Sequence, residues 1–407
     1  MAELKRTLGL AECIFYGVGS ILGAGIYTLI GKTAGLAGNM TWLAFLIASV
    51  CALFTAFSYA ELSTSFPKAG GEYVYAKEAF GKKTGIALGM IITLNGIVTG
   101  SAVAVGFAGY FNDLTGTSLG FVPFAIIALI FLVNSAGIKQ SSTINIIFTI
   151  IEVGGLLFII FSALPEFGKA DFVELPPGGM GAVLTASALA FFAYVGFEEI
   201  VKLAEETNKP EKAIPRALFI TSAIVIVIYT LVALSAVSVV PFEELGRSKS
   251  PLADVIQSRF GQTGIVIISV IALFSTSNTI LSNMLGASRI FLNMSKETKA
   301  LKIFSKVSSK RKTPVAALLL ILGVMCGFAL IGSIETVARI ATVFIFITFI
   351  GVNLCVIVLR IKKKSMKRHY KVPLNIRNIP VISVLGVLMT LVLLGYNLYS
   401  LFTGQEG

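Results

Sequence analysis

Eleven apolar stretches, each about twenty residues long, follow one another along this 407-residue chain and constrain its fold more than any other feature. Only α-helices and closed β-barrels satisfy every backbone polar group inside a bilayer, and the alternating segments of about ten residues that build a barrel are absent. The sequence therefore predicts an all-α polytopic membrane protein with a single domain over residues 1–407. The expected spans lie near residues 12–36, 40–66, 85–110, 120–138, 143–164, 180–205, 212–240, 262–291, 314–332, 336–361 and 379–402.

The charged residues agree with these spans. They make up only 13% of the chain, and its 33 Lys and Arg residues exceed its 21 Asp and Glu residues. With the N-terminus in the cytoplasm, most basic residues fall in cytoplasmic segments, above all near 293–313 and 362–378, as the positive-inside rule requires. The basic residues left for the outer loops are Lys32, Lys169, Arg247, Lys249 and Arg259. We therefore expect a cell-membrane protein with a cytoplasmic N-terminus, an extracellular C-terminus and no nucleic-acid partner.

The first span is rich in glycine near its middle. Gly19 and Gly23 have the spacing of close helix packing, which is one reading of this pattern. The other reading is an unwound midpoint, where Gly23, Ala24 and Gly25 expose backbone N–H and C=O groups to a ligand. The first span alone does not decide between the two.

The sixth span carries a glycine followed by two carboxylates, Gly196, Glu198 and Glu199, which is an expensive arrangement inside a membrane. When helices are interrupted at matching positions in the two halves of a chain, the interruptions indicate the binding site of an inverted-repeat transporter. We therefore expect a 5+5 inverted-repeat core with broken first and sixth helices. The first repeat covers about 10–165, the second about 178–361, and an extra C-terminal helix covers about 379–402.

Four motifs resemble the family of amino acid, polyamine and organocation permeases. They are GSILGAGI at 19–26, YAEL at 59–62 leading to FPKAGGEYVY at 66–75, FAYVGFE at 192–198, and GASR at 286–289. The resemblance runs from residue 10 to about 360 and implies a ten-helix core that moves amino acids or related amines by alternating access. Eleven spans differ from the twelve that are usual in the family.

A zwitterionic amino acid needs an anion site and a cation site close together, and the ends of a broken helix provide both without charged side chains. We therefore assign the substrate carboxylate to the N–H groups of Ala24 and Gly25, next to Gly23. By resemblance to the family, the ammonium meets the carbonyls of Ile21, Phe192 and Val195.

Three residues of the sixth span are candidates for gates. The family resemblance gives Phe192 the role of an aromatic gate over the substrate, although packing in the core is the common fate of a single Phe. For Phe197 the sequence does not decide between a gate and a residue packed in the core. Glu198 is expected to pair with a tyrosine or an Arg at the inner end, in a network with Tyr194, Glu199 and Arg289.

Glu152 lies in the middle of the fifth span, where an acid is functional by default. Several proton-coupled members of the family carry a Lys there, so this carboxyl is a candidate for the coupling proton, a cation ligand or a structural acid. Ser275 and Thr276 of the eighth span are candidates for the same ion site, with their hydroxyls bonded to their own helix as the alternative. We favour protons over sodium because Glu152 carries a proton unaided.

Other function classes fit the sequence less well. The chain has one histidine, His369, and none of the common hydrolase or nucleotide-binding motifs, so no enzyme, cofactor or metal is expected. Pore rings and filter repeats are absent, which disfavours a channel. We expect proton-coupled import of small or apolar amino acids by a monomer or weak homodimer. An amino acid or polyamine exchanger, a sodium-coupled symporter and a non-transporting nutrient sensor are the alternatives.

Overall fold

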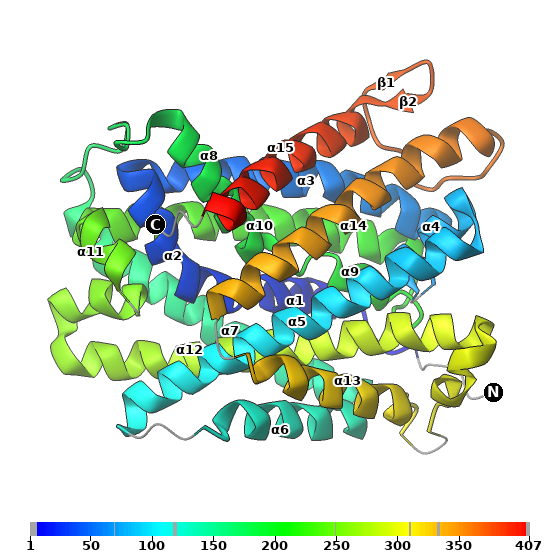
Figure 1. Cartoon of the computed structure of the whole chain (residues 1–407), viewed down its shortest axis with the longest axis horizontal. Helices are drawn as coiled ribbons and strands as arrows, with labels where there is room; N and C mark the ends of the chain where they lie inside the picture. Colours follow the sequence, from blue (N-terminus) through cyan, green and yellow to red (C-terminus); the bar gives the residue numbers. More distant parts are fainter. Residues whose placement is uncertain are drawn as a thin grey trace.

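The computed structural model of the chain is a bundle of helices that run roughly along one axis, which is horizontal in Figure 1. The structure describes residues 6–68, 70–116, 120–248, 250–308, 311–331 and 334–403, so Lys249, assigned above to an outer loop, lies outside the described residues. The N-terminus, α4 (Gly71–Phe80) and the β-hairpin lie toward one end, on the right in Figure 1, which we call the inner side.

The long helices correspond to the expected spans. They are α1 (Leu10–Ile21) with α2 (Ala24–Ala37), α3 (Thr41–Ser65), α5 (Lys82–Thr115), α6 (Val122–Ala136), α7 (Ile138–Ala163), α8 (Gly179–Ala190) with α9 (Glu199–Lys202), α10 (Pro210–Val239), α12 (Pro251–Glu297), α13 (Val315–Ala329), α14 (Ile334–Lys362) and α15 (Val381–Thr403). The shorter elements are α11 (Phe242–Arg247), the 3₁₀ turns η1 (Gly38–Met40), η2 (Leu164–Glu166), η3 (Phe191–Tyr194) and η4 (Lys299–Ser305), and the antiparallel strands β1 (Asn375–Ile376) and β2 (Ile379–Pro380).

These helices have the length and composition of membrane spans. Within the described residues, nine helical stretches are long and apolar enough to cross a bilayer, and α6 and α13 are shorter apolar helices. Large apolar side chains are exposed on the outside of the bundle, among them Leu132, Phe161 and Leu388. Apolar exposure of this kind fits a lipid environment, and the predicted all-α polytopic membrane fold is confirmed.

Both predicted breaks are present. In the first span, α1 ends at Ile21 and α2 begins at Ala24, with Leu22 and Gly23 between them. In the sixth span, α8 runs into the turn η3, then Val195 is extended and Gly196 has a φ of +132° before α9 begins. A positive φ of this size favours glycine, so Gly196 is the residue that allows the sixth helix to break.

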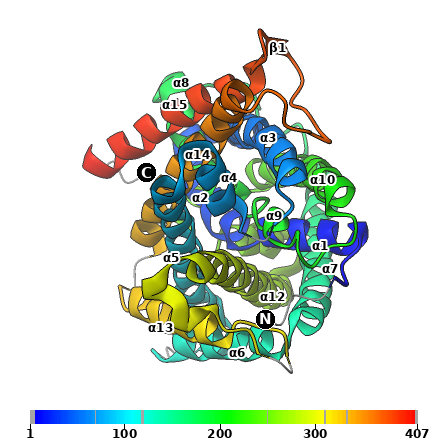
Figure 2. The same ribbon diagram turned by 90° about the vertical axis from the view of Figure 1, so that its right-hand side faces the viewer.

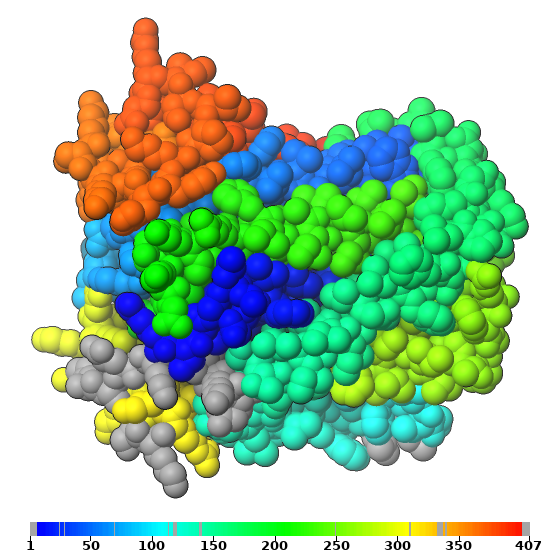
Figure 3. All heavy atoms as spheres, turned by 180° about the vertical axis from the view of Figure 1, so that it is seen from behind, coloured from blue at the N-terminus to red at the C-terminus, as the bar shows by residue number. Residues whose placement is uncertain are grey.

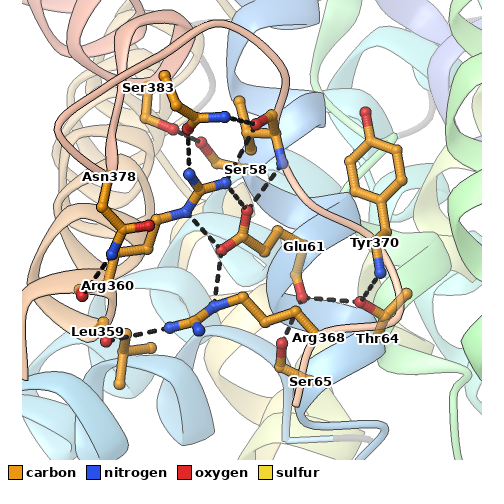
Figure 4. Close-up of polar contacts among 12 residues, drawn as sticks. Ser58, Glu61, Thr64, Ser65, Leu359, Arg360, Arg368, Tyr370, Asn378 and Ser383 are labelled. Carbon is orange, nitrogen blue, oxygen red and sulfur yellow. Dashed lines mark hydrogen bonds and ion pairs between the residues drawn. The ribbon is translucent and has the colours of Figure 1, made fainter. Parts of the chain in front are cut away.

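The loop between α14 and α15 is held to the inner end of α3 by a buried carboxylate. Glu61 accepts a hydrogen bond from Nε of Arg360 at 2.9 Å and from the backbone N–H of Val372 at 2.8 Å, and Nε of Arg368 lies 3.1 Å from Oε1 of Glu61. Figure 4 shows both guanidinium groups turned toward this carboxylate. We call Glu61, Arg360, Arg368 and Val372 the Glu61 cluster.

The sequence from Gly70 to Lys83 is amphipathic enough to predict a short helix that lies at the inner interface as an anchor. The structure contains this helix, but most of its side chains are buried, including Glu72, Tyr73 and Tyr75. It packs against α5, α12 and α14, so it is part of the protein interior at the inner side.

Candidate functional site

The two helix breaks are pressed against each other in the centre of the bundle. A Cβ atom on Gly25 would lie 2.5 Å from Cα of Ala193, and a Cβ atom on Gly196 would lie 2.4 Å from the carbonyl oxygen of Ser20. Neither position has room for a side chain, because both neighbours are backbone atoms. Gly25, which was predicted to be unwound, is helical and lies in the first turn of α2, whereas Gly196 lies in the break itself. Together they let the backbones beside the two breaks touch.

The predicted substrate-binding residues come together at this contact. Ala24 and Gly25 open α2, so their N–H groups belong to the first turn, where a helix has no internal acceptors. The side chain of Ala24 lies outside the described part of the chain. Gly23 stands at the break with its Cα facing the hydroxyl of Thr279 from α12. The carbonyl of Phe192 accepts a hydrogen bond from the backbone N–H of Val195 at 3.2 Å.

Tyr229 of α10 joins the two breaks. Its hydroxyl lies 2.6 Å from the carbonyl oxygen of Ile21 and 3.0 Å from that of Ala193. The Ile21 carbonyl, assigned above to the substrate ammonium, therefore already has a donor in this structure. A lone tyrosine in an apolar span carries no pattern that would have identified it from the sequence.

The two aromatic gate candidates belong to different clusters. Phe192 packs in a cluster with Leu29 of α2, Val98 and Ala102 of α5, and Val337 and Ala341 of α14. Phe197 lies edge-on to Tyr59, with ring centroids 5.7 Å apart, and contacts Phe349 at 5.2 Å. Phe192 thus contacts the outer half of the first span, whereas Phe197 lies among aromatic rings of α3 and α14.

Glu152 is fully buried on α7 and reaches the first break through Ser275 of α12. The Ser275 hydroxyl contacts Oε1 of Glu152 and also lies 3.2 Å from the carbonyl oxygen of Leu22. The hydroxyl of Thr276 bonds back to the carbonyls of Ala272 and Leu273 in its own helix. The structure therefore brings Glu152 and Ser275 together. Thr276 instead bonds to its own helix, which was the alternative to a role in the ion site.

An amide network that the sequence analysis did not identify surrounds this pair. Asn278 donates to the carbonyl of Gly19 at 3.3 Å and to the hydroxyl of Thr149 at 3.2 Å, and Asn145 donates to Asn278 at 2.7 Å. These bonds tie α7 and α12 to the first span just before its break. Buried amides in an apolar helix were the available signal, since they need partners.

Comparison with known proteins now decides the family. A family model described as amino acid permease matches residues 8–405. The chain belongs to the amino acid permease family. This confirms the resemblance drawn from the four motifs.

Three relatives illustrate the range of named functions. The permease is 30% identical over 417 residues to the branched-chain amino acid permease BcaP of Bacillus subtilis (strain 168), covering 96% of this chain and 88% of that protein. It is 28% identical over 405 residues to the methylthioribose transporter of the same organism, covering 94% and 87%. It is 29% identical over 387 residues to cationic amino acid transporter 4, vacuolar, of Arabidopsis thaliana, covering 88% and 64%. The permease is therefore a multi-pass membrane transporter and not an enzyme.

At the inner end of the permease, Glu198 and Arg289 have partners that differ from the expected ones. Glu198 accepts a hydrogen bond from the backbone N–H of Gly196 at 2.9 Å, so its carboxylate satisfies the break of its own helix. Arg289 of α12 pairs instead with Glu206, at 2.9 and 3.2 Å, and both side chains are fully buried. Burial raises the pKa of the Glu206 carboxyl, and the Arg289 guanidinium acts against this shift.

The N-terminal segment is hydrogen-bonded to the same segment as Arg289. Leu8 forms a parallel β-bridge with Thr207, and the backbone N–H groups of Thr7 and Leu8 donate to the Glu206 carbonyl at 2.9 and 3.0 Å. Figure 3 shows this segment, in dark blue, seated against the green chain that follows α9. The inner halves of the first and sixth spans are thus linked to each other and, through Arg289, to α12.

Proposed function

We propose that this permease imports small or apolar amino acids by proton-coupled symport and alternating access. In this proposal the first repeat covers about 10–165, the second about 178–361, and the N-terminus lies in the cytoplasm with the C-terminus outside. The substrate binds between the two breaks, with its carboxylate on the N–H groups of Ala24 and Gly25. Its ammonium takes the carbonyls of Ile21, Phe192 and Val195.

The observation that supports proton coupling is the double contact of Ser275. A hydroxyl has one hydrogen, yet Ser275 lies against two acceptors, the Leu22 carbonyl and the Glu152 carboxyl. If Ser275 donates to Leu22, the Glu152 carboxyl must supply the hydrogen of the other bond and is protonated. If Glu152 loses its proton, Ser275 turns to the carboxylate and the Leu22 carbonyl loses its donor. The proton on Glu152 is in this way connected to the backbone at the break of the first helix.

The groups that lie on either side of the breaks support the proposal of alternating access. Phe192 packs against the outer half of the first span, and the Arg289–Glu206 pair lies at the inner end. A substrate held between the breaks is therefore separated from the two sides by different groups. Opening one set while the other stays closed moves the substrate across the membrane.

The choice of substrate rests on what surrounds the breaks. Glu152 is engaged with Ser275, and Glu198 is engaged with the backbone of Gly196, so both acids have partners other than a substrate side chain. This arrangement favours small or apolar amino acids over lysine, arginine or polyamines. The named substrate of BcaP, a branched-chain amino acid, fits the same preference.

Uptake into proteoliposomes tests the proposal. A counterflow panel of the twenty amino acids and putrescine identifies the substrate, and a pH gradient, acidic outside, should then drive its accumulation. The Glu152→Gln variant should lose gradient-driven accumulation and keep exchange, while Glu244→Gln on the exposed α11 behaves as the unmodified permease.

Each alternative gives a different result in the same experiment. Accumulation driven by a sodium gradient at constant pH would assign sodium to the Ser275 site. Exchange that no gradient drives would make the permease an exchanger, and binding without any flux would make it a sensor. Unchanged accumulation by Glu152→Gln would reject the proton role of this residue.

A further inference from the structure

We propose that a buried cluster beneath the break of the sixth helix binds a second proton, separate from the one on Glu152, and that the cluster releases it when the inner side opens. The cluster consists of Glu72, Glu198, Glu199 and Lys202. The proposal rests on the transport function proposed above, because it describes how the inner side of that transporter opens.

The four side chains come from two elements that meet at the inner side. Lys202 and Glu199 of α9 form a salt bridge, and both side chains are at most 3% exposed. Glu72 of α4 accepts a hydrogen bond from the hydroxyl of Tyr59 at 2.8 Å and is fully buried. The Lys202 ammonium interacts electrostatically with Glu72 and Glu198 as well as with Glu199. Figure 2, which faces the inner side, shows α9 among α1, α4 and α10.

The charges of this cluster do not balance if every acid is ionised. Three carboxylates face a single ammonium, because the nearby Arg289 guanidinium is paired with Glu206. Glu198 accepts the Gly196 N–H and Glu72 accepts the Tyr59 hydroxyl, but both donors are neutral, so Lys202 supplies the single counter-charge. At least one acid of the pair Glu72 and Glu199 is therefore left without a counter-charge, which is costly for a buried group.

Hydrogen bonding points to the same conclusion by an independent route. Within the described residues, Oε2 of Glu72 and Oε2 of Glu199 are buried atoms with no hydrogen-bond partner. Burying an ionised carboxylate oxygen without a donor costs more free energy than burying the same oxygen in a neutral carboxyl, so these two atoms favour a protonated acid. A proton taken from hydronium neutralises one carboxylate, returns a water molecule, and leaves the other carboxylate to balance Lys202.

Glu199 is the group whose surroundings change when the inner side opens. Its Oε2 lies against Gly286 of α12, so close that a Cβ atom on that glycine would be 1.5 Å away. Glu199 belongs to the inner half of the sixth span, which must separate from α12 for the inner side to open. Separation admits water to Glu199, and water stabilises the ionised form. We therefore place the proton on Oε2 of Glu199 in the closed state, where Oε1 of the same carboxyl still accepts from the Lys202 ammonium.

The inner opening should then depend on pH through this group. A proton bound only in the closed state favours closure at low pH, and raising the pH favours opening by up to about tenfold per pH unit. The titratable and charged groups that interact with Glu199 are Tyr16 of α1, Glu72 of α4, and Glu198 and Lys202 of its own segment. Around them, Tyr59 of α3 and Tyr75 of α4 interact with Glu72, and Arg289 of α12 pairs with Glu206.

A native cysteine reports the opening without substrate. Cys13 is buried on α1, and its Sγ lies 3.4 Å from the hydroxyl of Thr207, so labelling requires the inner halves to move apart. The experiment uses the full permease with Cys51, Cys326 and Cys355 replaced by Ala, and measures the rate of maleimide labelling of Cys13 from about pH 6 to about pH 9. Because thiolate formation also accelerates labelling, each variant is compared with the unmodified background at the same pH.

Two variants and one control decide the outcome. Glu199→Gln should remove the extra acceleration of labelling with pH. The ratio of the labelling rate of the background to that of Glu199→Gln should therefore change by about tenfold between about pH 6 and about pH 9. Glu78→Gln, on the exposed face of α4, should follow the background. Lys202→Met removes the counter-charge and should move the extra acceleration to higher pH, which keeps the proposal testable if Glu199→Gln does not fold.

Parallel profiles for the background and Glu199→Gln, or no shift in Lys202→Met, would overturn the proposal. The readout uses neither a substrate nor a gradient. A failure of proton-driven uptake therefore leaves this result standing, and a failure here leaves the role of Glu152 standing.

Discussion

The hydroxyl of Tyr229 lies 2.6 Å from the carbonyl oxygen of Ile21, the last residue of the inner half of the first span. The same hydroxyl lies 3.0 Å from the carbonyl oxygen of Ala193 in the break of the sixth span. A broken helix leaves carbonyls without intrahelical donors. One side chain from α10 therefore reaches the broken ends of both helices, and its single hydrogen serves the two carbonyls between them. A substrate ammonium that takes the Ile21 carbonyl competes with this hydroxyl.

Replacing Tyr229 with Phe should destabilise the substrate-free permease by about 1 to 3 kcal/mol, because the two buried carbonyls lose the one hydroxyl hydrogen that they share. Saturating substrate should restore part of this loss, since its ammonium donates to the Ile21 carbonyl. Thermal unfolding in detergent, with and without the substrate found by counterflow, measures both effects. Tyr396→Phe on α15, which lines a hollow on the outer surface of the bundle, is the control. An equal substrate effect in Tyr229→Phe and the control contradicts the competition.

Replacing Gly25 with Ala should abolish transport. The added Cβ would meet Cα of Ala193 at 2.5 Å, and a backbone atom cannot move aside as a flexible side chain does. Overpacking of this kind costs about 1 to 3 kcal/mol and separates the two breaks that the substrate must contact. Gly109→Ala is a matched control, because nothing lies within 4 Å of its new Cβ. Counterflow rates near those of the control would mean that the breaks need not touch.

The fold could be predicted because the signals that determine it are local. Apolar runs set the spans, and the glycines at 23, 25 and 196 mark where two of them break. Each signal depends only on residues that are neighbours in the chain, so no knowledge of packing was needed.

Much of the site could not be predicted, because its contacts join distant helices. Tyr229 and Asn278 meet the first span only after α10 and α12 have packed against it. The partner of Glu198 was missed for a different reason, since this carboxylate binds the backbone two residues away instead of a charged side chain. From the sequence, Ser275 and Thr276 are equivalent candidates for the ion site. The structure distinguishes them, because the Thr276 hydroxyl bonds to its own helix whereas the Ser275 hydroxyl reaches the Leu22 carbonyl.

Replacing Glu61 with Gln should release the loop between α14 and α15. The change leaves Arg360 and Arg368 buried without their shared counter-charge, which should cost about 3 to 5 kcal/mol. The loop near 362–378 is rich in Lys and Arg, so limited digestion with trypsin reports its release. Glu78→Gln removes the half-exposed partner of Lys363 and should cost at most about 1 kcal/mol. Equal digestion of the two variants would show that the Glu61 cluster does not hold this loop.

Variants of the buried pair of Arg289 and Glu206 distinguish an effect on the stability of the permease from an effect on the opening of its inner side. Arg289→Met alone should destabilise the permease by about 3 to 5 kcal/mol, because Glu206 is left buried without its partner. Glu206→Gln in addition should recover most of this loss, since an uncharged amide needs no counter-ion. The double variant still lacks the ion pair that joins the inner half of the sixth span to α12. We therefore expect it to unfold near the normal temperature and yet label Cys13 faster than the unmodified permease. Normal labelling in a double variant of normal stability would show that this pair stabilises the fold without closing the inner side.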